Sequence, residues 1–321
     1  MDSDSLLPVS SFQLPVIDFS DQTLKPGSSK WDQVKFDVRK ALEDYGCFEA
    51  SFGKVSMELK KSVFEAMQEL FELPIQTKQR NVSPKPFHGY LNHNLYQSLG
   101  VDDANVLEKV NDFAQQIWPD LGNKSISETI HKFSEQLSEL DVMVRRMIME
   151  SFGIEKYVNE HLNSTNYFFR MMKYTSPPFD AENDDVEETN LGLRSHTDKS
   201  IITILHQYEV DGLELKTKDE KWIKVKPSQD SFIVMVGDSL WALLNGRLSS
   251  PYHRVMMKKT RYSTALFSVP KDEVIIDSPE ELVDEEHPRI FKPFEYGDFI
   301  RFFQTDAGRR AQSTLQAFCA L

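Results

Sequence analysis

Cysteine is scarce in this chain, which has two among its 321 residues. Cys47 and Cys319 are too few for a disulfide framework and lack the spacing of a zinc site. A reducing compartment is therefore expected. No apolar run is long enough to cross a membrane, and the first residues are acidic where a signal or transit peptide carries basic ones. These features predict a cytoplasmic protein.

Positive charge is also in short supply, with 37 Lys and Arg against 50 Asp and Glu and a formal net charge of −13. Nucleic-acid binding draws on clustered basic residues, so a nucleic-acid partner is excluded. The densest acidic stretch, 180–188, lacks the alternating ligands and fixed glycine of a calcium loop. It is predicted to be a solvated loop, with room for a gating role before His196. The expected partner is a small molecule, without a membrane or an obligate protein partner.

The first half of the chain is predicted to be mainly helical. Apolar residues recur at three- and four-residue spacing over 31–45 and over 59–70, so each segment presents one apolar face. A third helix is expected to begin at Ser125, where Glu128 completes a capping-box pattern, and to stop near Gly153. A helix of that length can brace a sheet.

The second half changes to short β-rich runs separated by turns. Several such runs favour an antiparallel sandwich or jelly roll over a βαβ fold. A last helical stretch is predicted over 297–318, with Phe299, Phe302 and Phe303 on its apolar side. The predicted strands are 167–174, 201–207, 213–215, 222–225, 231–236 and 262–269.

Three residues in the second half carry most of the chemical information. His196 and Asp198 stand one residue apart, and His253 follows later. Two imidazoles and one carboxylate can occupy one triangular face of an octahedral metal, which leaves the other face open for O2 and a chelating cosubstrate, as in non-haem Fe(II) oxygenases. Beyond His253, Arg261 and Ser263 would share one strand face. A guanidinium fork with a hydroxyl suits the far carboxylate of a dicarboxylate.

In these residues the chain resembles the plant Fe(II)/2-oxoglutarate-dependent dioxygenases. The likeness extends over nearly the whole chain, and within the family it is greatest for the alkenyl/hydroxyalkyl-producing branch, which acts on glucosinolate side chains. The matching segments are Leu14-Pro15-Val16-Ile17-Asp18-Phe19, Asp44-Tyr45-Gly46-Cys47-Phe48, Gly212-Leu213-Glu214-Leu215, Gly237-Asp238 and Asn245-Gly246-Arg247.

The resemblance implies a fold that is mainly β with flanking helices. Its core would be a double-stranded β-helix, or jelly roll, that holds iron near one mouth. Residues 1–160 would form a mostly helical N-terminal region packed on the core, 161–295 the catalytic core, and 296–321 a C-terminal helix covering the barrel.

The resemblance also implies Fe(II) as cofactor, 2-oxoglutarate and O2 as cosubstrates, and ascorbate as a supporting reductant. It makes Tyr174 a third residue on the distal carboxylate of 2-oxoglutarate, beside Arg261 and Ser263. Relatives commonly have Asn two residues before this tyrosine, where this chain has Met172, which cannot donate a hydrogen bond. Cosubstrate binding is therefore expected to depend more on the other three residues.

The prime substrate is the open question at this stage. The leading hypothesis is a small plant metabolite such as a methylsulfinylalkyl glucosinolate, oxidised on its side chain. The alternatives are a hormone acid such as auxin and a non-catalytic jelly-roll binding protein. Hydroxylation, desaturation and side-chain cleavage all remain open. The candidate lining residues are Phe87, His88, Tyr90, Phe169, Met172 and Phe267.

Overall fold

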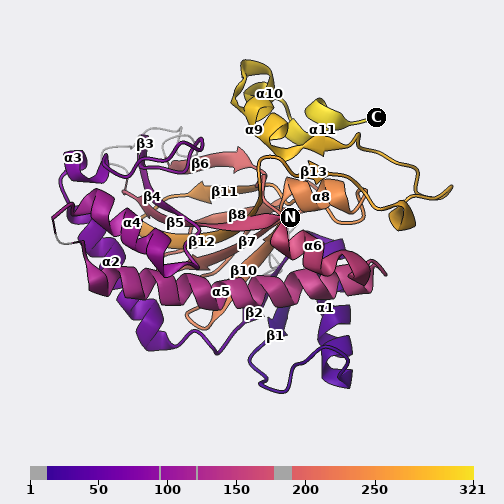
Figure 1. Cartoon of the computed structure of the whole chain (residues 1–321), viewed down its shortest axis with the longest axis horizontal. Coiled ribbons are helices and arrows are strands. Elements are labelled where there is room, and N and C mark those ends of the chain that lie inside the picture. The colour runs from indigo at the N-terminus through magenta and orange to yellow at the C-terminus, as the bar shows by residue number, and fades with distance from the viewer. Residues whose placement is uncertain (1–12, 94, 121, 177–189) are drawn as a thin grey trace, which may run out of the picture.

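Two β-sheets face each other in the computed structural model, which describes residues 13–93, 95–120, 122–176 and 190–321 (Figure 1). The larger sheet has the strand order β1-β2-β10-β7-β12-β5-β4-β3, and the smaller has the order β6-β11-β8-β9. All pairings in both sheets are antiparallel except β1 with β2. The strands are β1 Val16–Asp18, β2 Cys47–Ser51, β3 Leu91–His93, β4 Tyr96–Asp102, β5 Thr165–Tyr174, β6 Leu191–His196, β7 Ile202–Gln207, β8 Leu213–Lys216, β9 Trp222–Lys224, β10 Ser231–Val236, β11 His253–Met256 and β12 Arg261–Pro270.

Apolar side chains of the two sheets meet in the interior of the barrel. Leu205 and Met235 of the larger sheet join Leu215 of the smaller one in one cluster. Ala265 and Val255 belong to a second cluster nearer the other end. Because side chains alternate along a strand, the larger sheet keeps a second apolar face for the helices. The arrangement confirms the predicted jelly-roll core with flanking helices.

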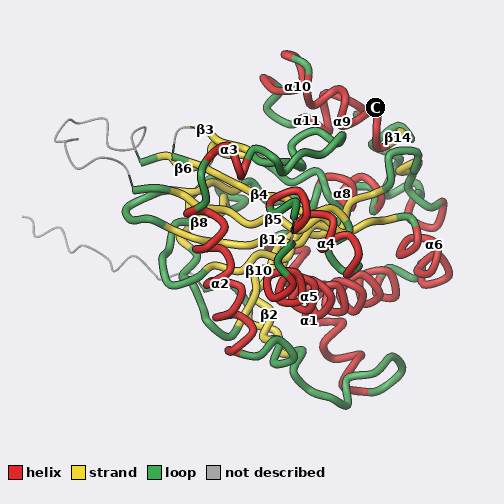
Figure 2. Tube along the Cα trace, turned by 60° about the vertical axis from the view of Figure 1, so that its left-hand side comes forward, coloured by secondary structure: helices red, strands yellow, loops and turns green. Residues whose placement is uncertain are grey.

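Helices cover the outer face of the larger sheet, and α5 is the longest of them (Figures 1 and 2). It packs on α1, α2 and α4 and on strands β7 and β12. Its cap is Asn123, whose side chain accepts the N–H of Ile126, so the helix begins slightly before the predicted Ser125. In the described part of the chain no helix is long and apolar enough to cross a membrane. The helices of this half are α1 Ser29–Tyr45, α2 Met57–Glu72, α3 Ile75–Lys78, α4 Leu107–Ile117, α5 Lys124–Ser151 and α6 Val158–Asn163.

The N-terminal region also supplies four strands that the helical prediction missed. β1 and β2 extend one edge of the larger sheet, and β3 and β4 extend the other. β2 pairs with β10, whose residues lie 180 to 188 positions further along the chain (Ser51 with Ser231, Cys47 with Met235), so no local pattern marks it as a strand. The predicted boundary at 160 therefore marks a change in composition, and the sheet runs across it.

The C-terminal segment forms three short helices where one was predicted. They are α9 Tyr296–Gln304, α10 Asp306–Arg310 and α11 Thr314–Cys319, and they lie against α8 Asp238–Leu243 and the hairpin of β13 Ile275–Ile276 and β14 Phe294–Glu295 (Figure 1). Thr305 interrupts the predicted helix. Its backbone is extended, and its hydroxyl accepts the N–H of Gly308 at 3.1 Å, which caps the next helix.

Candidate metal and cosubstrate site

The structure brings the three predicted metal ligands together at one mouth of the barrel. His196 ends β6 and pairs directly with His253, the first residue of β11, while Asp198 follows in the loop. One ligand atom from each lies within 4.8 Å of the others. A β-bulge between this pair and the next, Val255 with Leu193, lets both Leu193 and His196 serve the interior.

Backbone carbonyls fix which imidazole nitrogens face the centre. His196 donates from Nδ1 to the carbonyl of Arg194 at 2.8 Å, and His253 donates from Nδ1 to that of Pro251 at 3.3 Å. A carbonyl can only accept, so in each neutral imidazole the proton is on Nδ1 and Nε2 carries the lone pair that a metal ion needs. The two Nε2 atoms lie 3.7 and 3.8 Å from Oδ1 of Asp198. Burial lowers the pKa of His196 to about 3, so this imidazole is neutral near pH 7.

A hydrogen bond likewise fixes the orientation of the Asp198 carboxylate. Thr203 on β7 donates to its Oδ2 at 2.7 Å, which leaves Oδ1 for the centre. The backbone N–H of Asp238 donates to the Asp198 carbonyl, and Asp238 Oδ2 accepts from Thr197 at 3.0 Å and from Lys199 at 2.8 Å. Side chains on both sides of Asp198 are thus tied to the start of α8.

Gly237 permits this close contact between α8 and the ligand loop. A Cβ at this position would lie 2.0 Å from the carbonyl oxygen of Ser200. Any other residue would push β10 away from the loop, and with it the Thr203 and Asp238 contacts.

Arg261 lies fully buried inside the barrel, at the start of β12. It donates to the Ser263 hydroxyl at 2.9 Å and to Oε1 of Gln207 at 3.0 Å, and its Nε is buried without a partner. Among the described residues no carboxylate forms an ion pair with it. Burial lowers its pKa, yet a guanidinium remains charged at neutral pH. A buried cation without a counter-ion indicates an anionic ligand.

Tyr174 lies beside this guanidinium, which is 5.1 Å from the centre of its ring. Burial raises the pKa of Tyr174, so its hydroxyl stays protonated and donates. In this structure it donates to the thioether of Met172, with 3.7 Å between oxygen and sulfur. Met172 therefore accepts the hydrogen of the phenol, at the position where the resemblance leads one to expect Asn.

These residues fit the cofactor and cosubstrate that the sequence implies. Two imidazole nitrogens and one carboxylate oxygen suit Fe(II), and thiolates, which suit zinc or iron–sulfur clusters, are missing from the described cluster. The orphaned guanidinium of Arg261, with Ser263 and Tyr174 around it, matches a dicarboxylate's far end. The donor set and the buried cation are on the same interior surface.

The candidate substrate residues lie in different places. Phe267 and Met172 lie on the interior face, near Phe168, and His88 stacks on Phe168 with ring centres 3.9 Å apart. Phe87 is exposed at the rim. Tyr90 lies in the neighbouring loop and packs against the helix-side core.

Phe169 does not face the barrel interior, contrary to the prediction. It lies on the opposite face of β5, fully buried against Phe133 in the helix-side core, with ring centres 5.8 Å apart. Side chains alternate along a strand, so residues 169 and 172 cannot point to the same face. The predicted gating loop, 180–188, lies outside the described residues.

Sequence reasoning missed Gln207, Thr203 and Arg170. Gln207 and Thr203 lie on the interior face of β7, and Arg170 lies on that of β5. Polar residues in an otherwise apolar strand such as Ile202–Gln207 are the signal that was available. Only strand pairing shows which partners they meet.

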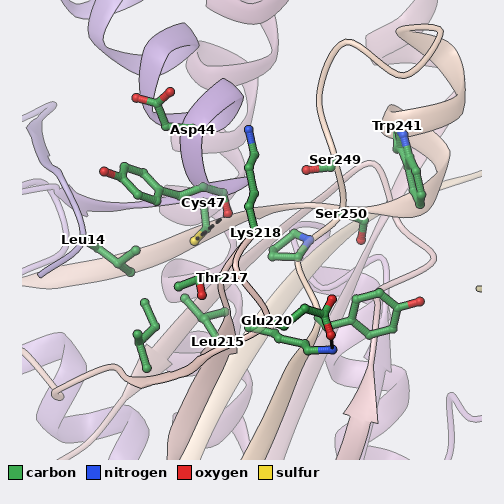
Figure 3. Close-up of a pocket in the computed structure, with 15 residues that line it drawn as sticks. Leu14, Asp44, Cys47, Leu215, Thr217, Lys218, Glu220, Trp241, Ser249 and Ser250 are labelled. Carbon is green, nitrogen blue, oxygen red and sulfur yellow. Dashed lines mark hydrogen bonds and ion pairs between the residues drawn. The ribbon is translucent and has the colours of Figure 1, made fainter. Parts of the chain in front are cut away.

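A separate cavity of about 220 Å³ lies outside this site, and its walls are drawn in Figure 3. None of the metal or cosubstrate residues lines it. The buried Cys47 thiol faces it and donates to the carbonyl of Tyr45 at 3.5 Å. The cavity therefore plays no part in the site described above.

Two family models match the chain. The 2OG-Fe(II) oxygenase superfamily matches residues 159–270, and the N-terminal region of the non-haem dioxygenases, described for morphine synthesis, matches residues 14–117. The first match contains all the metal and cosubstrate candidates described above. The second covers the part of the chain that supplies strands β1 to β4.

Known proteins of this kind are similar over the whole length. The probable 2-oxoglutarate-dependent dioxygenase AOP1.2 of Arabidopsis thaliana is 80% identical over 322 residues, covering 100% of both chains. The rice dioxygenase for auxin oxidation has a TM-score of 0.79 and 30% identity, over 96% of this chain and 100% of that one. JOX2, solved with 2OG, Fe and JA, has a TM-score of 0.76 and 26% identity, over 92% and 86% of the two chains.

Proposed function

We propose that this chain, which belongs to the 2-oxoglutarate- and Fe(II)-dependent oxygenase superfamily, oxidises the side chain of a small plant metabolite at its His196, Asp198 and His253 centre. The dioxygenase class follows from the family. The observation that carries the assignment of the site is the pairing of this donor set with the buried Arg261, which forms no ion pair with any carboxylate in the described part of the chain. A metal face and an anion receptor inside one barrel suit a chelating dicarboxylate.

Each residue has a separate task in this proposal. The two Nε2 atoms and Oδ1 of Asp198 hold Fe(II), and Thr203 keeps the carboxylate turned toward it. Arg261 and Ser263 bind the far carboxylate of 2-oxoglutarate, and Tyr174 donates to it. Iron with 2-oxoglutarate and O2 supplies the oxidation of an unactivated C–H bond. The apolar walls around Phe267 orient the substrate and exclude water.

A methylsulfinylalkyl glucosinolate is the leading candidate for the prime substrate. The support is the likeness to the alkenyl/hydroxyalkyl-producing branch, together with 80% identity to a probable AOP1-type dioxygenase. The substrate's sulfate and thioglucose require polar and cationic groups at the pocket mouth. Arg170 and His88, which both contact the ring of Phe168, are the candidates for these groups.

A hormone acid such as auxin is the second candidate. The observation that favours it is the likeness to the rice enzyme of auxin oxidation, at a TM-score of 0.79 over nearly the whole chain. An indole acid requires an aromatic slot, and Phe168 stacks with Phe267 at 5.8 Å between ring centres. We further propose a cytoplasmic location, with ascorbate as reductant and without a nucleic-acid or obligate protein partner.

A turnover assay tests the proposal. Protein with Fe(II), ascorbate and 2-oxoglutarate is incubated with a methylsulfinylalkyl glucosinolate, with indole-3-acetic acid, or with plant extract, and succinate formation is measured. We expect succinate to rise with one of these and a product to form at the same rate. Binding of 2-oxoglutarate without any turnover would instead support a non-catalytic jelly-roll protein.

A further inference from the structure

Arg170 lies on the interior face of β5, in the wall of the barrel that faces the metal centre. Its neighbour on β12 is Ala265, and the next interior pair is Phe168 with Phe267. Phe267 in turn pairs with Thr203 on β7, the residue that holds Asp198. β5 and β7 are two strands apart, about 10 Å. An arginine side chain spans most of that distance.

The register also separates Arg170 from the cosubstrate residues. Arg261 pairs with Tyr174 and Ser263 with Met172, so the dicarboxylate's far end belongs deeper along the strand. Arg170 is one interior position nearer the level of Thr203 and the metal ligands. It therefore lines the space between the cosubstrate receptor and the pocket mouth.

The guanidinium of Arg170 is held in place but its charge is not matched. It lies 5.0 Å from the ring centre of Phe168 and 5.9 Å from that of Phe267, and it donates to the carbonyl of Phe87. Its Nε is buried and has no hydrogen-bond partner. Within the described ranges it forms no ion pair with a carboxylate. Aromatic faces and one carbonyl offset part of a cation's desolvation, and an anion would offset the rest.

His88 stacks on Phe168, the ring that the Arg170 guanidinium also contacts. Its Nδ1 donates to Oδ1 of Asp102 at 2.5 Å, and the Ser83 hydroxyl donates to the second oxygen of that carboxylate at 2.9 Å. The Asp102 carboxylate is thus committed to His88 and Ser83. The ring keeps Nε2 as its remaining polar atom.

We infer that Arg170, with His88 on the same ring of Phe168, is the receptor for an anionic group of the prime substrate, a sulfate or a carboxylate. The inference rests on the proposed function, and it adds the substrate's chemical class. A guanidinium binds either anion through paired N–H groups, and the rings of Phe168 and Phe267 hold the apolar part that follows. Arg261 binds the cosubstrate's anion and Arg170 the substrate's.

A merely structural Arg170 makes a different prediction. If the only role of Arg170 is its hydrogen bond to the carbonyl of Phe87, its removal should loosen the rim and lower the affinity for charged and neutral ligands alike. A receptor instead discriminates by charge. The deciding quantity is therefore the ratio of affinities for an anion and its neutral counterpart.

The test is anaerobic calorimetry on the full chain loaded with Fe(II) and 2-oxoglutarate. The probes are two pairs: a methylsulfinylalkyl glucosinolate with its desulfo form, and indole-3-acetate with indole-3-acetamide. In the unaltered protein one anion should bind roughly tenfold to a hundredfold more tightly than its neutral partner. The pair that shows this preference identifies the anion as sulfate or as carboxylate.

Arg170→Gln should bring that ratio close to one, and Arg170→Lys should keep part of it. Lys173→Gln is the matched control, because it removes the same charge from the opposite face of β5, where Lys173 lies over the ring of Tyr262. It should leave the ratio unchanged. The melting temperature and the affinity for 2-oxoglutarate are measured for each variant, to show that fold and cosubstrate site persist.

Three results would contradict the assignment of Arg170 as the anion receptor. They are equal affinities within both pairs for the unaltered protein, binding of neither anion, and an unchanged ratio in a folded Arg170→Gln. Failure of the proposed function looks different, because the unaltered protein would then bind no 2-oxoglutarate or form no succinate. The two failures are distinguishable, because 2-oxoglutarate binding and succinate formation are measured separately from the ratio of substrate affinities.

Discussion

Strand β5 presents two faces with different surroundings. Phe169 and Met171 point toward the helices and are fully buried in the largest apolar cluster. Arg170, Met172 and Tyr174 point into the barrel. There the Tyr174 hydroxyl donates to the Met172 thioether, and Nε of Arg170 is buried without a hydrogen-bond partner. Alternate residues of this strand therefore contribute to the stability of the fold on one face and to ligand binding on the other. Changes on the helix side should alter the free energy of unfolding, and changes on the barrel side should alter ligand affinity.

The largest effect is expected at the metal ligands of the barrel side. His196→Ala, Asp198→Ala and His253→Ala should each abolish 2-oxoglutarate turnover, because each removes one ligand atom. The fold should survive, since little core volume is lost. Succinate formation and thermal melting are the measurements. Turnover at the unaltered rate in any of the three would remove that residue from the metal site.

Phe169→Ala tests the helix side of β5. Removing a fully buried ring should lower the free energy of unfolding by about 3–5 kcal/mol. The affinity of the remaining folded protein for 2-oxoglutarate should not change. Urea denaturation and a ligand titration measure the two quantities. Unchanged stability with weaker substrate binding would show that Phe169 lines the pocket, as the sequence analysis predicted.

Arg261→Lys should weaken 2-oxoglutarate although the charge is kept. A point ammonium cannot donate to Ser263, to Gln207 and to a bidentate ligand at once. The dissociation constant should rise on the order of tenfold to a hundredfold. Arg309→Lys, at an exposed position of α10, is the matched control. A large loss for the prime substrate with 2-oxoglutarate unaffected would assign Arg261 to the substrate.

Met172→Asn and Met171→Asn compare the two faces directly. On the barrel side the new amide can donate to 2-oxoglutarate, and binding should tighten by about 0.5–1.5 kcal/mol while the prime substrate loses its thioether contact. On the helix side the same amide would be buried without a partner and should destabilise the fold by about 1–3 kcal/mol. Thermal shifts with each ligand decide. Equal destabilisation at both positions, with unchanged affinities, would make Met172 structural.

The smallest effect concerns the two thiols, which lie away from the site. Burial raises the pKa of Cys47 and of Cys319 to about 12, so neither forms an appreciable thiolate near neutral pH. Alkylation by iodoacetamide should be negligible in the folded protein and should reach both thiols on unfolding. Rapid labelling of Cys47 alone would show that the cavity in Figure 3 opens to reagents.

Sequence patterns predicted the parts of this molecule that local rules determine. Apolar spacing located α1, α2 and α5, and β-rich runs located most barrel strands. Ligand chemistry and the resemblance selected His196, Asp198 and His253, which the structure places within reach of one ion. The short edge strands were missed because their partners are distant in the sequence.

Face assignment was the other weakness. The predicted strand 167–174 already separates Phe169 from Met172 by an odd number of residues, so alternation alone would have excluded one of them. Gln207 and Arg170 depend on pairing register, which no local pattern encodes. The bulge that turns His196 inward is likewise a property of the β6–β11 pair.

The most direct test of the metal site is a count of bound iron. Under anaerobic conditions with 2-oxoglutarate present, the unaltered chain should retain one Fe(II) per molecule after gel filtration. Asp198→Ala should retain almost none, while its melting temperature without metal equals that of the unaltered chain. Stoichiometric iron in a folded Asp198→Ala would contradict the assignment of His196, Asp198 and His253 as the metal-binding residues.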